Sequence, residues 1–232
     1  MIVEKYNTSF GDFKAFKNCK EITRALRENR MFHPEIMGWI ENHIHSDSTF
    51  IDIGSNIGIY SIYIAKKYKN THTISVEAHP EVFGLLKENK NLNNIDNMDV
   101  VNLAASNVDG DILKMSSLVE PIKEFRGNFG DNRIGDGSLN VASVRVDSIS
   151  IEKPVSVIKI DVQGYDYYAL LGCENIIKQY KPVIIIEWEQ EMIPDKNINF
   201  SHLENYMNKF GYKLTKSYNK DFLFMYDKKQ EI

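Results

Sequence analysis

Cysteine is nearly absent from the sequence, and the two residues present, Cys19 and Cys173, are isolated and far apart. This spacing supports neither a disulfide framework nor a zinc cluster, so we expect a reduced, cytoplasmic protein. Long hydrophobic runs are also lacking. The longest, PVIIIEW at 182–188, is too short to span a bilayer, and the N-terminal stretch has no apolar signal core, so we expect no membrane partner.

An excess of either charge is missing as well. The 28 Lys and Arg residues and the 32 Asp and Glu residues are interspersed, for a formal net charge of −4. Without a basic patch there is no electrostatic footprint for nucleic acid, and none is expected as a partner. His43 and His45 lie close together only in a polar connection, so no set of metal ligands stands out and we expect no bound metal.

What the sequence does contain is an alternation of short apolar runs and amphipathic stretches, over a length typical of one α/β domain. Runs rich in Ile and Val predict buried parallel strands at 49–53, 72–78, 99–105, 155–161 and 182–188. Helical spacing of apolar residues predicts helices at 57–68, 80–92 and 167–180. The repeated βαβ order predicts a Rossmann-like, doubly wound, mostly parallel sheet that binds ligands at the carboxyl ends of its strands.

The two ends of the chain depart from this alternation. Two strands separated by a polar turn at 211–227 predict an antiparallel C-terminal hairpin that closes the sheet. Near the N-terminus, HPEIMGWIENHI at 33–44 predicts a helix with Pro34 at its first position. We therefore expect an accessory segment with a helix at 1–48 and a single globular domain at 49–232.

A glycine turn follows the first parallel strand in FIDIGSNIGIYS, at 50–61. Gly54 ends the apolar run, and Gly58 stands where a helix can begin. The turn lacks the G-x-G-x-x-G spacing that admits a pyrophosphate, and no Gly-Lys-Ser/Thr follows for a Walker loop. It brings a ligand against backbone amides and a helix N-terminus, which suits a single carboxylate. Tight packing of the strand against the helix explains the glycines equally well.

Glu77 ends the second predicted strand, 23 positions after Gly54. An acid at this place can accept hydrogen bonds from both hydroxyls of a ribose. A solvated charge at a strand terminus is the plain alternative for Glu77 alone. A nucleoside with a carboxylate and no pyrophosphate describes S-adenosylmethionine, which we therefore predict as the cofactor.

Four successive stretches resemble the blocks of the FkbM-type S-adenosylmethionine-dependent methyltransferases. They are FIDIGSNIGIYSIYIA, ISVEAHPEVFGLLKENKNLN, DVVNLAASNVDGDILKM and VIKIDVQGYDYYALLGCENIIKQYKPVIIIEWE, and together they span about residues 50–189. The resemblance implies a class I methyltransferase fold for residues 49–232. It also implies O-methylation of a hydroxyl on a sugar, a glycan or a similar polyhydroxylated small molecule.

The resemblance also assigns cofactor-binding positions. They are Asp52, Gly54, Ser55, Asn56 and Gly58 in the first block, Glu77 and Ala78 in the second, Ala104 and Ala105 beside the adenine, and Asp161 in the fourth. Two of the blocks depart from the family pattern. Ala78 and His79 stand where an aromatic-Glu-Pro sequence is common, and Gln163 follows KIDV where the family has Glu. The second change puts in doubt an acid or base role for that side chain.

Methyl transfer to an alcohol needs the hydroxyl to be aligned with the methyl group of the donor, and it needs a group that accepts the hydroxyl proton. Lys159 and Asp161 alternate with Ile160 and so share one strand face, while Glu187 ends the following strand. We predict Asp161 as the base, with Lys159 orienting it and Glu187 as the third catalytic residue. An ion-pair cluster without a catalytic role, His79 as the base, and a magnesium ion shared by Asp161 and Glu187 are the alternatives.

A long polar segment at 116–140 is a candidate lid over the acceptor, with Arg126, Asn128, Asn132 and Arg133 as possible donors to it. Tyr165, Tyr167 and Tyr168 offer faces for a sugar ring, although their spacing also suits helix packing. Two other functions stay open at this point, a nicotinamide-dependent oxidoreductase and a catalytically silent nucleoside-binding module. The missing G-x-G-x-x-G argues against the first.

Overall fold

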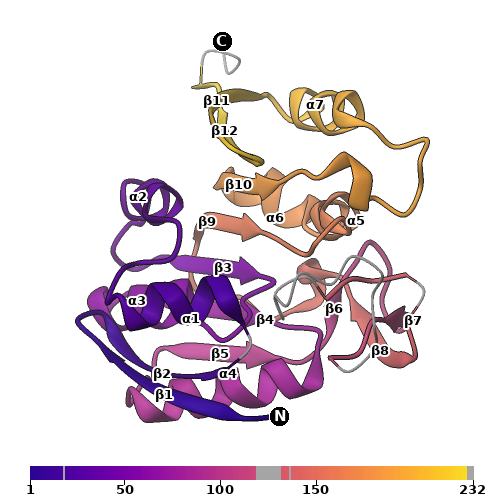
Figure 1. Cartoon of the computed structure of the whole chain (residues 1–232). Helices are drawn as coiled ribbons and strands as arrows, with labels where there is room; N and C mark the ends of the chain where they lie inside the picture. The colour runs from indigo at the N-terminus through magenta and orange to yellow at the C-terminus, as the bar shows by residue number, and fades with distance from the viewer. Residues whose placement is uncertain (18, 119–131, 136, 229–232) are drawn as a thin grey trace.

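The computed structural model describes residues 1–17, 19–118, 132–135 and 137–228 (Figure 1). Within them a seven-stranded sheet runs in the order β11-β12-β10-β9-β3-β4-β5. Its parallel strands are β3 (Thr49–Ile53), β4 (His72–Val76), β5 (Met98–Val101), β9 (Val155–Ile160) and β10 (Val183–Glu187). The antiparallel strands β11 (Tyr212–Tyr218) and β12 (Asp221–Tyr226) extend it beyond β10. The predicted doubly wound sheet and its C-terminal hairpin are both present.

Helices cover both faces of this sheet because the strands are apolar on both sides. On one face, α5 (Asp166–Leu171), α6 (Glu174–Tyr180) and α7 (Phe200–Lys209) form a buried core with strand residues such as Ile51, Ile158 and Ile184. On the other, α2 (Pro34–Glu41) and α3 (Ile59–Lys67) pack on Phe50, Val157 and Ile185. The order of strands reverses between β3 and β9, which places a ligand site at their carboxyl ends.

Two predicted elements are each divided in the structure. The run 99–105 separates into β5 and β6 (Ala104–Ala105), and β6 joins a small sheet with β7 (Ile112–Met115) and β8 (Leu139–Val144). Asn102 marks the division, since its Nδ2 donates to the carbonyls of Glu77 and Ala78 and draws the chain toward the end of β4.

The predicted helix 167–180 separates into α5 and α6 at Gly172. A Cβ atom on Gly172 would lie 2.1 Å from the carbonyl oxygen of Ser106, so the chain passes too close there for any other residue. The carboxylate of Asp147, in a short 3₁₀ turn at Val146–Ser148, then accepts the amides of Asn175 and Ile176 and caps α6 from outside the helix.

The N-terminal segment holds more structure than the single predicted helix. A hairpin of β1 (Val3–Thr8) and β2 (Gly11–Phe16) and the helix α1 (Lys20–Arg27) precede α2. Phe13 and Leu26 from this segment are buried against α3 and α4 (Pro80–Leu92). Asn89 on α4 accepts the amide of Lys14 and donates to its carbonyl, as a neighbouring strand would. No helix in the described ranges is long and apolar enough to cross a membrane.

Gly54 is required by the protein's own backbone. Its φ is +77°, in the left-handed region, and a Cβ atom there would lie 1.8 Å from the carbonyl oxygen of Asp161. Gly58 also has a positive φ, and its Cβ would meet Leu86 of α4 at 2.6 Å. The packing explanation for the two glycines is thus sufficient by itself, because it brings the ends of β3 and β9 together and seats α3 on α4.

The replacement of Gly54 by Ala is expected to destabilise the protein by at least about 1–3 kcal/mol, from strain in the left-handed region plus the clash with Asp161. Gly84 in the middle of α4 is the matched control, since a Cβ there meets nothing within 4 Å. Gly84→Ala is expected to stabilise by about 0.5–1 kcal/mol through helix propensity. Urea unfolding of both variants measures the difference, and equal stabilities would contradict this account of Gly54.

Candidate functional site

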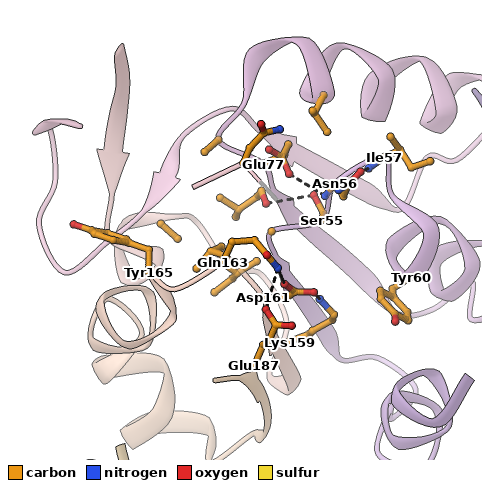
Figure 2. Close-up of a pocket in the computed structure, with 18 of the residues that line it drawn as sticks. Ser55, Asn56, Ile57, Tyr60, Glu77, Lys159, Asp161, Gln163, Tyr165 and Glu187 are labelled. Atoms are coloured by element: carbon orange, nitrogen blue, oxygen red, sulfur yellow. Dashed lines mark hydrogen bonds and ion pairs between the residues drawn. The ribbon is translucent and has the colours of Figure 1, made fainter. Parts of the chain in front are cut away.

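A cavity of about 260 Å³ opens at the carboxyl ends of β3, β4, β9 and β10. Ten of the predicted site residues line it: Gly54, Ser55, Asn56, Glu77, Ala78, Ala104, Ala105, Lys159, Asp161 and Glu187. Figure 2 shows them in two groups, with Ser55, Asn56 and Glu77 around the glycine turn and Lys159, Asp161 and Glu187 at the neighbouring strand ends. One cavity therefore joins the predicted cofactor residues to the predicted catalytic residues.

Glu77 is held in place by two backbone amides. Its Oε2 accepts from Asn56 N at 2.9 Å and its Oε1 from His79 N at 2.8 Å, and the side chain is buried. Burial raises the pKa of Glu77 to about 7, against the opposing effect of the two amides. Each carboxylate oxygen keeps a lone pair for a further donor, so two adjacent hydroxyl groups can bind here together.

The amides of the glycine turn are already used within the protein. Those of Gly54 and Ser55 donate to the carbonyl of Val76, that of Asn56 to Glu77, and those of Ile57 and Gly58 to Asn56 and Ser55. The expectation that these amides bind a carboxylate is therefore wrong for the turn as it stands.

An apolar wall lines another part of the cavity. Ala104 and Ala105 of β6 contribute to it together with Leu103, Met115 and Ile134. Ala78 completes the wall on the side of β4. A flat aromatic ring system can fill such a slot, with its polar groups toward Glu77.

Lys159 lies at the centre of the second group, and its side chain is 3% exposed. Its Nζ donates to Asp161 Oδ2 at 3.1 Å, lies 3.9 Å from Asp52 Oδ1, and is 5.1 Å from the ring centre of Tyr60. Burial alone would lower the pKa of Lys159, but the charges of Asp161 and Asp52 outweigh it and raise that pKa above its usual value. Lys159 is thus a fixed cation and not a proton acceptor.

Gln163 connects Asp161 to Glu187. Its Nε2 donates to Asp161 Oδ1 and to Glu187 Oε2, at 2.9 Å in each case. Burial would raise the pKa of Asp161, but the Lys159 charge and the hydrogen bonds from Glu187 and Gln163 hold it below its usual value. Burial and then the charge of Asp161 raise the pKa of Glu187 far above the usual value. The pair therefore carries one negative charge, on Asp161, and one proton, on Glu187.

Residues before the methyltransferase-like blocks also line the cavity. Glu21 and Ile22 reach it from α1, and Phe32 and His33 from the connection before α2. The rings of Phe32 and His33 stack with centroids 4.1 Å apart, and His33 holds a positive φ of 42°. The accessory segment thus forms one wall of the site, which no pattern in the sequence indicated.

Asp52, Gly58 and the alternative base His79 do not line the cavity. Asp52 is fully buried behind it, where Ser61 donates to its Oδ2 and Lys159 faces its Oδ1. Gly58 serves the packing of α3 on α4. His79 is buried, with Nδ1 accepting the amide of Glu81 at the start of α4. His79 therefore caps a helix instead of facing an acceptor.

The candidate lid lies only partly within the described residues. Arg126 and Asn128 fall outside them, whereas Asn132 lines the cavity and Arg133 does not. Of the three tyrosines, Tyr165 lines the cavity and stacks on Tyr168. Tyr167 packs against Trp188 and Tyr206, as the alternative of helix packing predicted.

Two lining residues, Tyr60 and Gln163, have roles that the sequence did not predict. Tyr60 stands two positions after Gly58, in the first turn of α3, where a side chain meets the ends of the neighbouring strands. This position in the motif is a signal that could have identified it. For Gln163 the sequence showed only the loss of an acid, because a bridge between two carboxyl groups depends on their separation in space.

Comparison with protein families matches residues 52–214 to the Methyltransferase FkbM domain, well over half of the chain. Among curated proteins, ribosomal protein L11 methyltransferase from Clostridium perfringens is 32% identical over 62 residues. That match covers 27% of this chain and 20% of the relative, so the chain corresponds to only a small part of that enzyme.

Two solved structures show the same fold at low identity. Methyltransferase FkbM from Methylobacillus flagellatus KT has a TM-score of 0.54 and 16% identity, over 91% of this chain and 56% of the other. A SAM dependent methyltransferase from Aquifex aeolicus has a TM-score of 0.50 and 13% identity, over 92% of this chain and 100% of the other. The predicted class I methyltransferase fold is confirmed.

Replacement of Lys159 by Met is expected to destabilise the protein by about 3–5 kcal/mol at pH 8, because it leaves Asp52 and Asp161 without their cation. Without that cation both carboxyl groups have raised folded pKa values. The stability is therefore retained below their unfolded pKa of about 3.9 and lost as the pH rises.

Lys178, paired with Glu174 on the surface of α6, provides the control. Lys178→Met is expected to change stability by less than about 1 kcal/mol at any pH. Denaturant unfolding of both variants at pH 5 and pH 8 tests the difference. A pH-independent loss for Lys159→Met would show that lost packing, and not the unpaired carboxylates, is the cause.

Proposed function

The chain belongs to the FkbM methyltransferase family, and from this membership we propose that it methylates a hydroxyl group of a sugar, a glycan or a similar polyhydroxylated acceptor. Its cofactor is S-adenosylmethionine, the methyl donor of methyltransferases of this kind. The observation that carries the proposal is the single cavity that joins Glu77 to Asp161. A donor bound at the first group can reach an acceptor bound at the second.

The residues around Glu77 fit the nucleoside part of this cofactor. The Glu77 carboxylate, fixed by two amides, suits the two ribose hydroxyls, and the wall of Ala104 and Ala105 suits the adenine ring. A pyrophosphate finds neither the second glycine of G-x-G-x-x-G nor free turn amides, which disfavours the nicotinamide alternative.

When bound, the cofactor supplies a methyl group already activated by its sulfonium. The protein then has to align the acceptor and take up the hydroxyl proton. Asp161 is the ionised group at the acceptor end, and Lys159 and Gln163 fix both of its oxygens in position. When the hydroxyl oxygen of an acceptor is methylated, Asp161 would accept its proton. Proton acceptance by a carboxylate at this place is what argues against a catalytically silent module.

The location of the protein and the class of its acceptor are also proposed. We propose a cytoplasmic location, since Cys19 and Cys173 are both buried thiols. We also propose a small-molecule or glycan acceptor and not a nucleic acid, on the balanced charge of the sequence. Tyr165 and the stacked pair of Phe32 and His33 give the acceptor end aromatic faces, on which a sugar ring can pack.

Glu77→Gln is expected to weaken binding of S-adenosylmethionine and its demethylated product by about 1.5–3 kcal/mol at pH 8. In the wild type, binding should weaken about tenfold between pH 8 and pH 6, because Glu77, with a pKa of about 7, must be ionised to accept from the ribose. The affinity of Glu77→Gln should not change between pH 8 and pH 6. Calorimetry at both pH values measures it, with Glu81→Gln on the surface as the control. Preferential binding of NAD would reject the cofactor assignment for the site.

The proposed reaction is tested by incubating a library of polyhydroxylated compounds with methyl-labelled S-adenosylmethionine and analysing the products by mass spectrometry. A single labelled methyl on an oxygen of one compound is the expected product. Asp161→Asn should then lower turnover by about 10²–10⁴-fold while leaving cofactor affinity nearly unchanged. Methylation only of nitrogen or carbon would reject O-methylation, and full turnover by the variant would remove Asp161 from proton transfer.

A further inference from the structure

Gln163 has both hydrogens of its amide nitrogen committed to the carboxyl pair. Nε2 lies 2.9 Å from Asp161 Oδ1 and 2.9 Å from Glu187 Oε2, and a carboxamide nitrogen carries two hydrogens to donate. Figure 2 shows the side chain lying across the ends of the two strands, between the carboxyl groups that it joins. Asp161 follows β9 and Glu187 ends β10, and this one side chain contacts both carboxyl groups.

The backbone that carries Gln163 is held in an uncommon conformation. Its φ is +53°, and that of Gly164 is +94°. The buried carboxylate of Asp166 accepts the amides of Val162 and Gly164, on either side of Gln163, at 2.8 Å each. A Cβ atom on Gly164 would lie 2.4 Å from the carbonyl oxygen of Met192, so the turn also fits closely against its neighbour. These constraints aim the amide at the two carboxyl groups before any ligand binds.

The surroundings of the pair are strongly acidic. The charged and titratable groups that face it from the packed elements are Lys159 on β9, Asp52 on β3, Asp166 on α5, Asp221 on β12, Glu189 after β10 and His33 before α2. Lys159 is engaged by Asp161 and Asp52 and does not contact Glu187. Two carboxyl groups this close in a buried site need a donor or a cation between them.

We propose that the Gln163 amide occupies the place of a divalent cation between Asp161 and Glu187, and positions both carboxyl groups for the acceptor without a bound metal. The inference rests on the proposed methyl transfer for its catalytic part only. Gln163 is a positioning residue, since it acts through the two carboxyl groups. Its neutral amide donates to one oxygen of each group, whereas a carboxylate at the same place would bring a second negative charge beside that of Asp161.

Gln163→Glu tests the proposal without any acceptor or cofactor. Thermal unfolding is measured from pH 5 to pH 8, with EDTA or with added Mg²⁺, for the wild type, this variant and Gln179→Glu. Gln179 is exposed on α6 and controls for the same chemical change on the surface. We expect the two variants to have similar melting temperatures near pH 5. At pH 8 the melting temperature of Gln163→Glu should be lower than that of Gln179→Glu by more than about 5 °C.

The added carboxyl group explains why the variant loses stability as the pH rises. Its folded pKa is raised by the neighbouring acids, so the stability of Gln163→Glu is retained below the unfolded pKa of about 4.3 and lost as the pH rises through the folded value. Added Mg²⁺ should restore most of the loss at pH 8, since three carboxylates suit an oxygen-preferring ion. Equal melting of the two variants at every pH would overturn the proposal. A loss that Mg²⁺ does not restore, or stabilisation of the wild type itself by Mg²⁺, would also overturn it.

Gln163→Leu provides the second variant, because it keeps a similar volume and removes both donors. On an acceptor found by the labelling experiment, its kcat should fall at least about tenfold, with unchanged affinity for S-adenosylmethionine. The ascending limb of its pH profile should move to higher pH, because unbridged carboxyl groups hold protons more tightly. The wild type should keep full turnover in EDTA. Wild-type kcat and pH profile for Gln163→Leu would overturn the proposal.

Failure of the proposed function and failure of the inference about Gln163 give different results. If the wild type methylates no compound, the proposed function fails, and the melting experiment still decides the role of Gln163. If methylation occurs but requires Mg²⁺ in the wild type, the proposed function stands and the inference about Gln163 is overturned.

Discussion

The buried ammonium group of Lys159 is the interaction on which the site depends. The register of β3 against β9 sets Asp52 directly opposite Lys159, in the buried interior of the sheet. An isolated carboxylate there would be expensive to bury, and Asp161 at the end of the same strand face would add a second. One cation between the two compensates both charges and holds the ends of β3 and β9 together where the strand order reverses. The cavity opens at that point because the fold diverges there.

Glu77 and Asp161, at the two ends of the cavity, are stabilised in different ways, and each environment suits a different function. Glu77 is held by backbone amides and burial, so it has a fixed geometry and a pKa near 7. Asp161 is held by an ammonium and a carboxamide, which keep it ionised. The first arrangement suits recognition of neutral hydroxyl groups, and the second suits a group that must be charged before an acceptor arrives. Glu187, which keeps its proton, limits the charge at that end to one.

Segments remote in sequence complete the enclosure. The N-terminal hairpin is joined to α4 through Asn89, and the helices after it bring Glu21, Phe32 and His33 to the cavity. The small sheet of β6, β7 and β8 supplies residues of the apolar wall of the cavity. Asp166, outside the cavity, fixes the turn at Gln163 by accepting the amides of Val162 and Gly164. The strand ends thus provide the chemical groups, and these flanking segments determine what shape of ligand fits between them.

The sequence by itself determined the layers and the position of the site. Runs of Ile and Val alternating with amphipathic stretches specify parallel strands and covering helices, since burial on both faces favours apolar residues at most strand positions. The periodicity of two also placed Lys159 and Asp161 on one face. Only the tertiary structure decided that Asp52 lies behind the cavity, that His79 caps a helix, and that Gln163 links two carboxyl groups. The first and the third depend on distances between residues of different strands, which follow from register and packing and which no local pattern of residues contains. The second depends on the conformation of the His79 side chain, whose Nδ1 accepts the amide of Glu81 two residues further on.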